Sequence, residues 1–198
     1  MAAFSVTFDY LCPFARIANE VVLRALAAGA DHQVDFRAFS LSQVHLGEGE
    51  QPVWLAEQPP SGVLALQWGL AVRDELPARF PAAHLAIFGA RHDHGRDLND
   101  PAVLREAVAS AGVDPDRVDK LVAGGGPAAA LAADHTWSVE RHRVFGVPTF
   151  VAGDRAVFVR LMSRPAGDRE ALATLERLLD LVTGWPDLNE LKTTRVPR

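Results

Sequence analysis

Cysteine is nearly absent from this sequence: Cys12 is the only one among 198 residues. A single cysteine cannot form a disulfide within the chain, and such low usage favours a reducing cytoplasm. The first ten residues lack both a basic start and an apolar stretch, so we expect no secretion signal. No run of about 18 apolar residues occurs either, so we expect no membrane span.

Positive charge is also in short supply. The formal net charge is −5 with histidine neutral, and the only lysines are Lys120 and Lys192. The arginines are scattered along the chain rather than clustered. Nucleic-acid binding needs a surplus of positive charge that faces the phosphates. We therefore expect no nucleic-acid partner, and we interpret most arginines as solvated surface.

Recognisable metal and phosphate motifs are missing as well. His92 and His94 are two positions apart, a spacing that does not place both on one helix face. No cysteine or glutamate accompanies them at ligand spacing. Glycines 124–126 follow no strand pattern and precede no Gly-Lys-Ser/Thr, so they are not a phosphate loop. We expect no metal site and no tightly bound cofactor.

The remaining composition is that of an ordinary globular protein. Hydrophobic residues make up 48% of the chain and charged residues 23%. A chain of this length suits one domain, or one domain that carries an insertion. It buries roughly 70% of its unfolded surface, so it can be stable without disulfides or metals.

The beginning of the chain predicts a strand, a helix and a second strand. Residues 4–10, FSVTFDY, alternate apolar with polar side chains, which is typical of a strand. A helix opens at Pro13 and closes at Gly29, and its apolar face consists of Phe14, Ile17, Val21, Val22 and Ala25. Residues 34–41 predict the second strand. This order favours a parallel pair joined by a crossover.

Residues 52–133 have a different character. They are rich in alanine and leucine, interrupted by short proline and glycine segments, and without any strand pattern. The clearest helix there has Asp100 as its N-cap and Pro101 at its first helical position. We predict a helical insertion over 52–133, which leaves 1–51 and 134–198 as one α/β domain.

The last third of the chain returns to a mixed pattern. Residues 129–146 predict a helix, and residues 147–153 and 156–159 predict two short strands joined as a hairpin by a Gly-Asp turn. Residues 168–183 predict an amphipathic helix, with Gly184 just past its end. One four-stranded mixed sheet surrounded by helices accounts for all of these elements.

Cys12 stands where the first strand meets the first helix. At the N-cap, free backbone N–H groups and the helix dipole would favour the thiolate, so we expect a lowered pKa. Pro13 fixes the start of the helix, and Phe14 would give an apolar lip. Alternatively, Cys12 is a small buried hydrophobic residue. We interpret Asp9 as a strand-end surface residue rather than one that tunes Cys12.

A second signal lies at Val147-Pro148-Thr149, before the third strand. A proline at this position lacks an N–H for the sheet, and a cis bond could place it beside the start of the Cys12 helix. The Val147 backbone would then be available to an extended substrate. The alternative is an ordinary trans proline that begins an edge strand.

These motifs resemble a known family. F-D-Y-x-C-P-F at the end of the first strand, the helical insertion and G-V-P-T resemble the DsbA-like branch of the thioredoxin superfamily. That branch includes kappa-class glutathione transferases and 2-hydroxychromene-2-carboxylate isomerases. The MSRPAGDREA segment and the ELKTTRVPR tail look most like actinobacterial DsbA-like reductases that use mycothiol.

The resemblance implies an α/β thioredoxin fold with an all-helical insertion. It implies that Cys12 is the nucleophile, within the motif Cys12-Pro13-Phe14-Ala15. It also implies that Pro148 is a cis proline facing the thiol and that Val147 and Thr149 flank the bound small thiol. The family's second cysteine is replaced by Ala15, so a dithiol mechanism is impossible and only a monothiol route remains.

Three functions follow as hypotheses. The leading one is a cytoplasmic thiol-dependent oxidoreductase, monomer or homodimer, which takes mycothiol or glutathione as cosubstrate and a small molecule or disulfide as substrate. The second is a kappa-like transferase or isomerase in which residue 12 only donates a hydrogen bond to a bound thiolate. The third is a thioredoxin-like binding module without catalysis.

Overall fold

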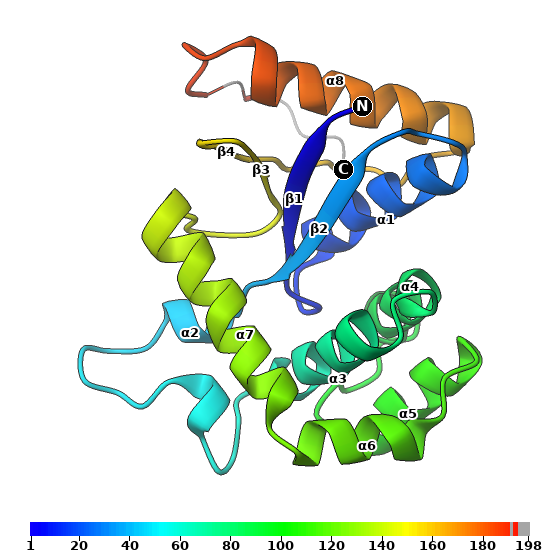
Figure 1. The fold of residues 1–198 in the computed structure, drawn as a ribbon, viewed down its shortest axis with the longest axis vertical. Coiled ribbons are helices and arrows are strands. Elements are labelled where there is room, and N and C mark those ends of the chain that lie inside the picture. Colours follow the sequence, from blue (N-terminus) through cyan, green and yellow to red (C-terminus); the bar gives the residue numbers. More distant parts are fainter. Residues whose placement is uncertain (191, 194–198) are drawn as a thin grey trace.

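The computed structural model describes residues 1–190 and 192–193, and most of the ELKTTRVPR tail lies outside them. The chain alternates strands and helices at both ends and is helical between them (Figure 1). In chain order the elements are β1 (Ala3–Phe8), α1 (Pro13–Ala27), β2 (Gln33–Ala38), α2 (Leu41–Val44), a 3₁₀ turn (Val53–Leu55), α3 (Val63–Glu75), α4 (Phe80–His92), α5 (Pro101–Ser110), α6 (Pro115–Ala123), α7 (Gly126–Thr136), a π-helical turn (Trp137–Arg141), β3 (Thr149–Ala152), β4 (Arg155–Phe158) and α8 (Asp168–Gly184).

The four strands form one mixed sheet in the order β2-β1-β3-β4. β1 pairs in parallel with β2, with Val6 opposite Phe36, and antiparallel with β3, with Val6 opposite Phe150. β4 completes a hairpin with β3, turned at Gly153, whose φ of +59° suits glycine. The predicted α/β class with one mixed four-stranded sheet is confirmed.

Strand β1 lies at the centre of the sheet and is buried on both faces. Phe4, Val6 and Phe8 contribute to the apolar core, as the alternation predicts. Ser5 and Thr7, on the opposite face, are buried as well, with 7% and 0% of their surfaces exposed. Helices on both sides of the sheet enclose the strand, so its polar side chains are buried together with its apolar ones.

Helix α1 begins as predicted, with Cys12 as its N-cap and Pro13 at its first position. Its buried surface is wider than the apolar stripe, because it includes Arg16, Asn19 and Glu20. Phe14, in contrast, is only half-buried. The helix packs against both α8 and α4, so the polar side that faces α4 is enclosed and needs partners within the protein.

Helices α3 to α6 gather at one end of the molecule, away from α8 (Figure 1). Asp100 caps α5 by accepting a hydrogen bond from the Ala102 N–H at 2.8 Å, and Asp114 caps α6 in the same way. Helix α7 runs across the boundary at 133/134. The division into a domain of 1–51 and 134–198 and an insertion of 52–133 stays a prediction.

The helix predicted over residues 129–146 is shorter than expected. α7 ends at Thr136, a π-helical turn follows over Trp137–Arg141, and the chain is irregular up to the start of β3. Arg143 adopts a positive φ of 53°, which a continuing helix does not allow. The predicted strand over residues 34–41 also ends early, at Ala38, because Ser40 caps α2.

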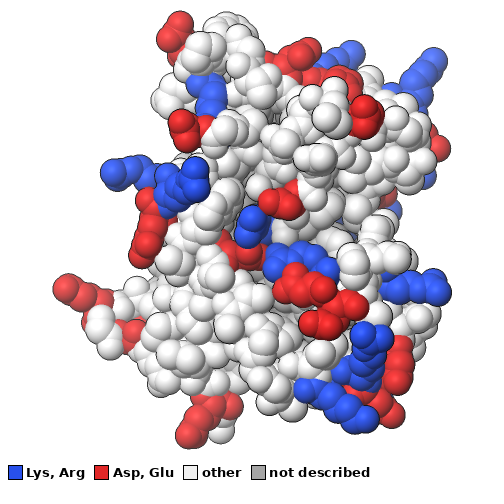
Figure 2. Space-filling view, viewed as in Figure 1, with Lys and Arg blue, Asp and Glu red and all other residues white. Residues whose placement is uncertain are grey.

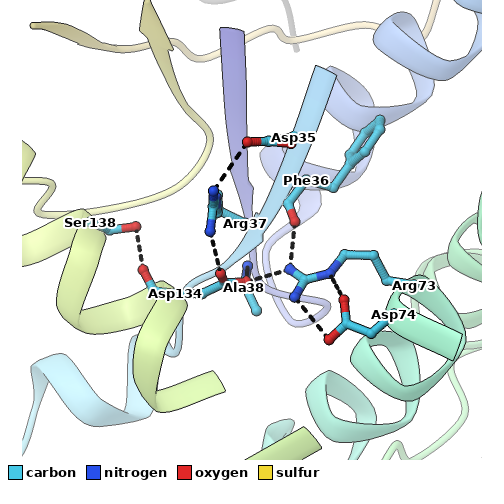
Figure 3. Close-up of polar contacts among 8 residues, drawn as sticks. All are labelled: Asp35, Phe36, Arg37, Ala38, Arg73, Asp74, Asp134 and Ser138. Atoms are coloured by element: carbon cyan, nitrogen blue, oxygen red, sulfur yellow. Dashed lines mark hydrogen bonds and ion pairs between the residues drawn. The ribbon is translucent and has the colours of Figure 1, made fainter. Parts of the chain in front are cut away.

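A buried carboxylate joins the helical part to the edge of the sheet. Asp134 of α7, with 2% of its surface exposed, pairs with Arg37 of β2 at 3.0 Å and with Arg73 of α3 (Figure 3). Its second oxygen also accepts a hydrogen bond from the Ala38 N–H at 3.0 Å. The carboxylate therefore satisfies a backbone donor of edge strand β2 and two guanidinium groups at once.

The surface charge is mixed. On the face shown in Figure 2, basic and acidic side chains are interspersed rather than gathered into a single-sign area. Much of this charge is paired, as in Arg105 with Asp116 and Asp119. None of the helices in the described part of the chain is both long and apolar enough to cross a membrane.

Removal of the Asp134 carboxylate should destabilise the fold. Asp134→Ala takes a buried partner from Arg37 and Arg73 and leaves the Ala38 N–H without its acceptor, and we expect a loss of about 3 kcal/mol in the free energy of unfolding. Urea denaturation measures this loss. Asp35→Asn is the matched control, because Asp35 also pairs with Arg37 but is largely exposed; we expect a change within about 0.5 kcal/mol. Equal effects of the two substitutions would contradict this role of Asp134.

Candidate active site

The sulfur of Cys12 lies at the N-terminus of α1. Cys12 has extended backbone angles and serves as the N-cap, and its Sγ accepts a hydrogen bond from the Ala15 N–H at 3.5 Å. The thiol in turn donates to the carbonyl oxygen of Val147 at 3.4 Å. Cys12 retains 8% of its surface exposed. The sulfur is thus held by backbone groups on two sides and still reaches the surface.

The three residues after Cys12 take different positions. Pro13 is exposed at the first turn of the helix, and Ala15 is fully buried beneath the sulfur. Phe14 is half-buried, and the guanidinium of Arg160 lies 4.6 Å from the centre of its ring. The role of Phe14 as an apolar lip beside the sulfur stays a prediction.

The Val147–Pro148–Thr149 segment faces Cys12 from the other side. The Val147–Pro148 peptide bond is cis, and all three residues are buried. The Thr149 N–H donates to Thr7 Oγ1 at 2.8 Å, and the Val159 N–H donates to the Pro148 carbonyl at 3.0 Å. Neighbouring strands therefore fix the segment on both sides, and the Val147 carbonyl stays directed at the sulfur.

Burial raises the pKa of the Cys12 thiol, so the prediction of a lowered pKa is wrong. The N–H groups of Ala15 and Phe14 and the charge of Arg160 favour the thiolate, as expected at a helix N-terminus. Desolvation of the sulfur outweighs them, and the negative charge of Asp9 acts in the same direction as desolvation. At neutral pH most molecules therefore carry the protonated thiol.

Asp9 is not the surface residue that its position at the strand end suggests. It is 2% exposed, and its carboxyl oxygens accept hydrogen bonds from the Leu11 N–H at 2.9 Å and the Leu41 N–H at 2.8 Å. Burial raises its pKa to about 6 in spite of these bonds. Through these hydrogen bonds Asp9 links the loop before Cys12 to the start of α2. Its negative charge contributes to the raised pKa of the Cys12 thiol.

A series of hydrogen bonds between buried polar side chains connects the start of α1 to α4 and to Tyr10. Asn19 donates to the Ala15 carbonyl at 2.8 Å and accepts from His84 of α4 at 3.2 Å. Burial lowers the pKa of His84 to about 3, so its ring is neutral, and Nδ1 accepts from the Tyr10 hydroxyl at 2.8 Å. His92 donates to the Tyr10 carbonyl at 2.9 Å and is therefore a structural residue.

Sequence patterns alone did not identify Thr7, Asn19 or Arg160 as parts of this site. Thr7 belongs to the polar side of an alternating strand, and Asn19 to a helix whose apolar stripe lies elsewhere. Arg160 follows β4, far from Cys12 in the sequence, and nothing in its neighbours marks it. Their roles depend on contacts between elements that are distant along the chain.

Other possible sites lie away from Cys12. A hollow of about 240 Å³ opens near the first residues of β1, lined by Ser5, Asp35, Trp137 and Val151 among others, at the opposite end of the strand from Cys12. Within residues 1–190 and 192–193, no group of three or more His, Cys, Asp or Glu side chains is arranged to hold a metal ion.

Comparison with known families decides the classification. Residues 5–165 match the family described as the DSBA-like thioredoxin domain. The chain belongs to this family. The cis proline opposite a cysteine at a helix N-terminus agrees with that membership.

Solved structures of DsbA-like proteins share the fold of this chain, and the predicted thioredoxin fold is confirmed. A probable DsbA oxidoreductase from Streptomyces coelicolor is 19% identical, with a TM-score of 0.64 over 98% of this chain and 94% of that one. The cytosolic disulfide reductase DsbM from Pseudomonas aeruginosa, solved with GSH, is 20% identical, with a TM-score of 0.61 over 90% of this chain and 100% of that one. No curated protein sequence matches this chain significantly.

This family is one of thiol–disulfide oxidoreductases, and the DsbA-like part of the resemblance is confirmed. The finer resemblances, to mycothiol-dependent reductases and to kappa-class enzymes, stay predictions. So do the roles assigned to Cys12, Val147, Pro148 and Thr149, although the structure brings these residues to one place.

The pH dependence of alkylation tests whether the pKa of the Cys12 thiol is raised or lowered in the folded protein. Only the thiolate reacts with iodoacetamide, so the rate rises with pH and its midpoint reports the thiol pKa. We expect a midpoint above that of a free cysteine peptide in the same buffers. Asp9→Asn removes a negative charge that raises the pKa, so its midpoint should be lower than that of the wild type.

The exposed Asp31, near the opposite end of α1, provides the matched control, because Asp31→Asn makes the same change in charge. We expect no change in the midpoint for this variant. A wild-type midpoint below that of the peptide would show that the helix N-terminus outweighs desolvation.

Proposed function

We propose that this protein is a thiol–disulfide oxidoreductase that works through Cys12 alone. The observation that carries the proposal is the position of the sulfur, 3.5 Å from the Ala15 N–H and 3.4 Å from the Val147 carbonyl, with no second cysteine in the chain. Family membership supports the reaction class. The alanine at position 15 restricts the chemistry to a monothiol route.

In the first step the Cys12 thiolate attacks one sulfur of a disulfide. The bond between Cys12 Sγ and that sulfur forms, the disulfide bond breaks, and the other half leaves as a thiolate with the electron pair. The proton of Cys12 has been given up to solvent before the attack. The Ala15 N–H and the Phe14 N–H stabilise the sulfur while it carries charge.

In the second step a small thiol releases the enzyme. Its thiolate attacks the outer sulfur of the mixed disulfide, a new small-molecule disulfide forms, and Cys12 leaves as a thiolate that takes up a proton. A thiol with a high pKa is a slow leaving group. Because burial raises the pKa of Cys12, we expect it to slow this release as well as to lower the fraction of thiolate available for the first step.

The cosubstrate in this proposal is a low-molecular-weight thiol, mycothiol or glutathione, and the location is the cytoplasm. The single cysteine supports both, since a reducing compartment supplies such thiols in excess. The similar reductase from Pseudomonas aeruginosa is described as cytosolic and was solved with GSH. The substrate is a small molecule or a disulfide.

Incubation with oxidised glutathione should modify Cys12. We expect the intact mass to rise by one glutathionyl group at a pH above the thiol midpoint, and reduced glutathione to remove it. Cys12→Ser should show no adduct and no disulfide turnover. Protein that stays unmodified while iodoacetamide labels Cys12 would refute the proposal, and turnover retained by Cys12→Ser would favour the transferase hypothesis.

Restoration of a second cysteine should change the course of the reaction. Ala15 lies at the position of the family's second cysteine, and its backbone N is 3.5 Å from Cys12 Sγ. In Ala15→Cys the new thiol should attack the mixed disulfide within the molecule, so the glutathionyl adduct should be replaced by an internal disulfide. Intact mass with and without alkylation distinguishes the two products.

Ala15 is fully buried, so the added sulfur costs about 1–3 kcal/mol of stability. Ala18→Cys is the matched control, since Ala18 is equally buried on the same helix but one turn further from Cys12. Its glutathionyl adduct on Cys12 should persist. A persistent adduct in Ala15→Cys as well would contradict the predicted geometry.

A further inference from the structure

Arg160 is a basic side chain that packs over Phe14, close to the start of the Cys12 helix. It follows β4, in the segment that starts where the Val159 N–H bonds to the carbonyl of Pro148. Its guanidinium lies 4.6 Å from the ring centre of Phe14, two residues after Cys12. Its charge also lowers the pKa of the thiol, so it is felt at the sulfur.

The charge of Arg160 is available to a ligand. Arg160 is exposed, and it makes no ion pair with any carboxylate in residues 1–190 and 192–193. The nearby Arg164 differs, because it pairs with Glu20 through two hydrogen bonds of 2.6 and 2.9 Å. Stacking holds Arg160 in place while leaving the N–H groups at the edge of its guanidinium free to bind an anion.

Aromatic rings surround this guanidinium. Arg160 lies 5.9 Å from the ring centre of Phe158 as well as above Phe14. Phe158 in turn lies 5.3 Å from Phe145, which is 71% exposed. A cation beside two aromatic rings is suited to a ligand that combines a carboxylate with an apolar or aromatic body.

The rest of the protein works against the binding of such a ligand. The chain carries a formal net charge of −5, and the buried Asp9 adds a negative charge near the sulfur above pH 6. An anionic disulfide therefore needs a local cation to approach Cys12 favourably. Arg160 is the cation placed to provide it.

We infer that Arg160 determines specificity at Cys12 and selects disulfide substrates that carry a carboxylate near the sulfur. This inference rests on the proposed function and adds the chemical class of its substrate. The carboxylate pairs with the Arg160 guanidinium, and the rest of the ligand lies against Phe14 and Phe158. The thiol exchange is the one described above, with the anionic half bonded to Cys12.

Two aromatic disulfides, one anionic and one neutral, separate the effect of the ligand's charge from the general reactivity of the Cys12 thiol. 5,5′-Dithiobis(2-nitrobenzoic acid) carries two carboxylates, whereas 4,4′-dithiodipyridine is neutral at pH 8, and both report on thiol exchange by absorbance. We compare second-order rate constants for the wild type, Arg160→Gln and Arg117→Gln. Arg117, exposed on α6 in the helical part, is a control with the same change of charge.

We expect Arg160→Gln to lower the rate constant with the anionic disulfide about fivefold more than with the neutral one, the size of a solvent-exposed ion pair. Arg117→Gln should leave both rate constants unchanged. Arg160→Lys, which keeps the charge, should retain most of the preference for the anionic probe. Added salt should reduce the preference of the wild type and not that of Arg160→Gln.

Two outcomes would overturn the inference while the proposed function stands. If Arg160→Gln slows both probes by one factor, Arg160 acts only through the thiolate. If it slows neither, Arg160 has no part in the reaction. A wild-type Cys12 that reacts with neither probe faster than a free thiol of equal pKa would instead refute the proposed function, and this inference with it.

Discussion

The thiol of Cys12 donates a hydrogen bond to the carbonyl of Val147, across 135 positions of sequence. This contact requires β1 and β3 to be antiparallel neighbours, because the end of β1 then meets the segment before β3. The hydrogen bond from the Thr149 N–H to Thr7 Oγ1 holds the same two strands together at the site. The strand order, the cis Val147–Pro148 bond and the position of the sulfur therefore belong to one structural arrangement.

Two opposed effects set the chemistry of that sulfur. The free N–H groups at the start of α1 stabilise a thiolate, and the packing that holds Cys12 against Val147 removes the water that would do the same. Burial prevails, and Asp9 adds to it. The result is a thiol that is ionised in few molecules at neutral pH and that, in the proposed reaction, is a slow leaving group from the mixed disulfide.

The helical part of the protein supports the site through polar contacts rather than through the apolar stripe of α1. The chain from Asn19 through His84 to Tyr10 links α1 to α4, and Asp134 links α7 and α3 to β2. The first network is buried and the second is centred on a buried carboxylate, so both stabilise one relative placement of these elements. The first turn of α1 is fixed between the sheet and the helices.

The sequence by itself determined the local elements and singled out Cys12 as the candidate nucleophile. Strand alternation, Pro13 after an N-cap cysteine and the Gly153 turn are short-range signals, and they predicted β1, the start of α1, the β3–β4 hairpin and the four-stranded sheet. The tertiary structure alone decided the burial of Asp9, the direction of the Cys12 pKa shift and the position of Arg160 over Phe14. Desolvation and charge depend on which distant segments pack around a group, and no pattern in its own neighbourhood records that.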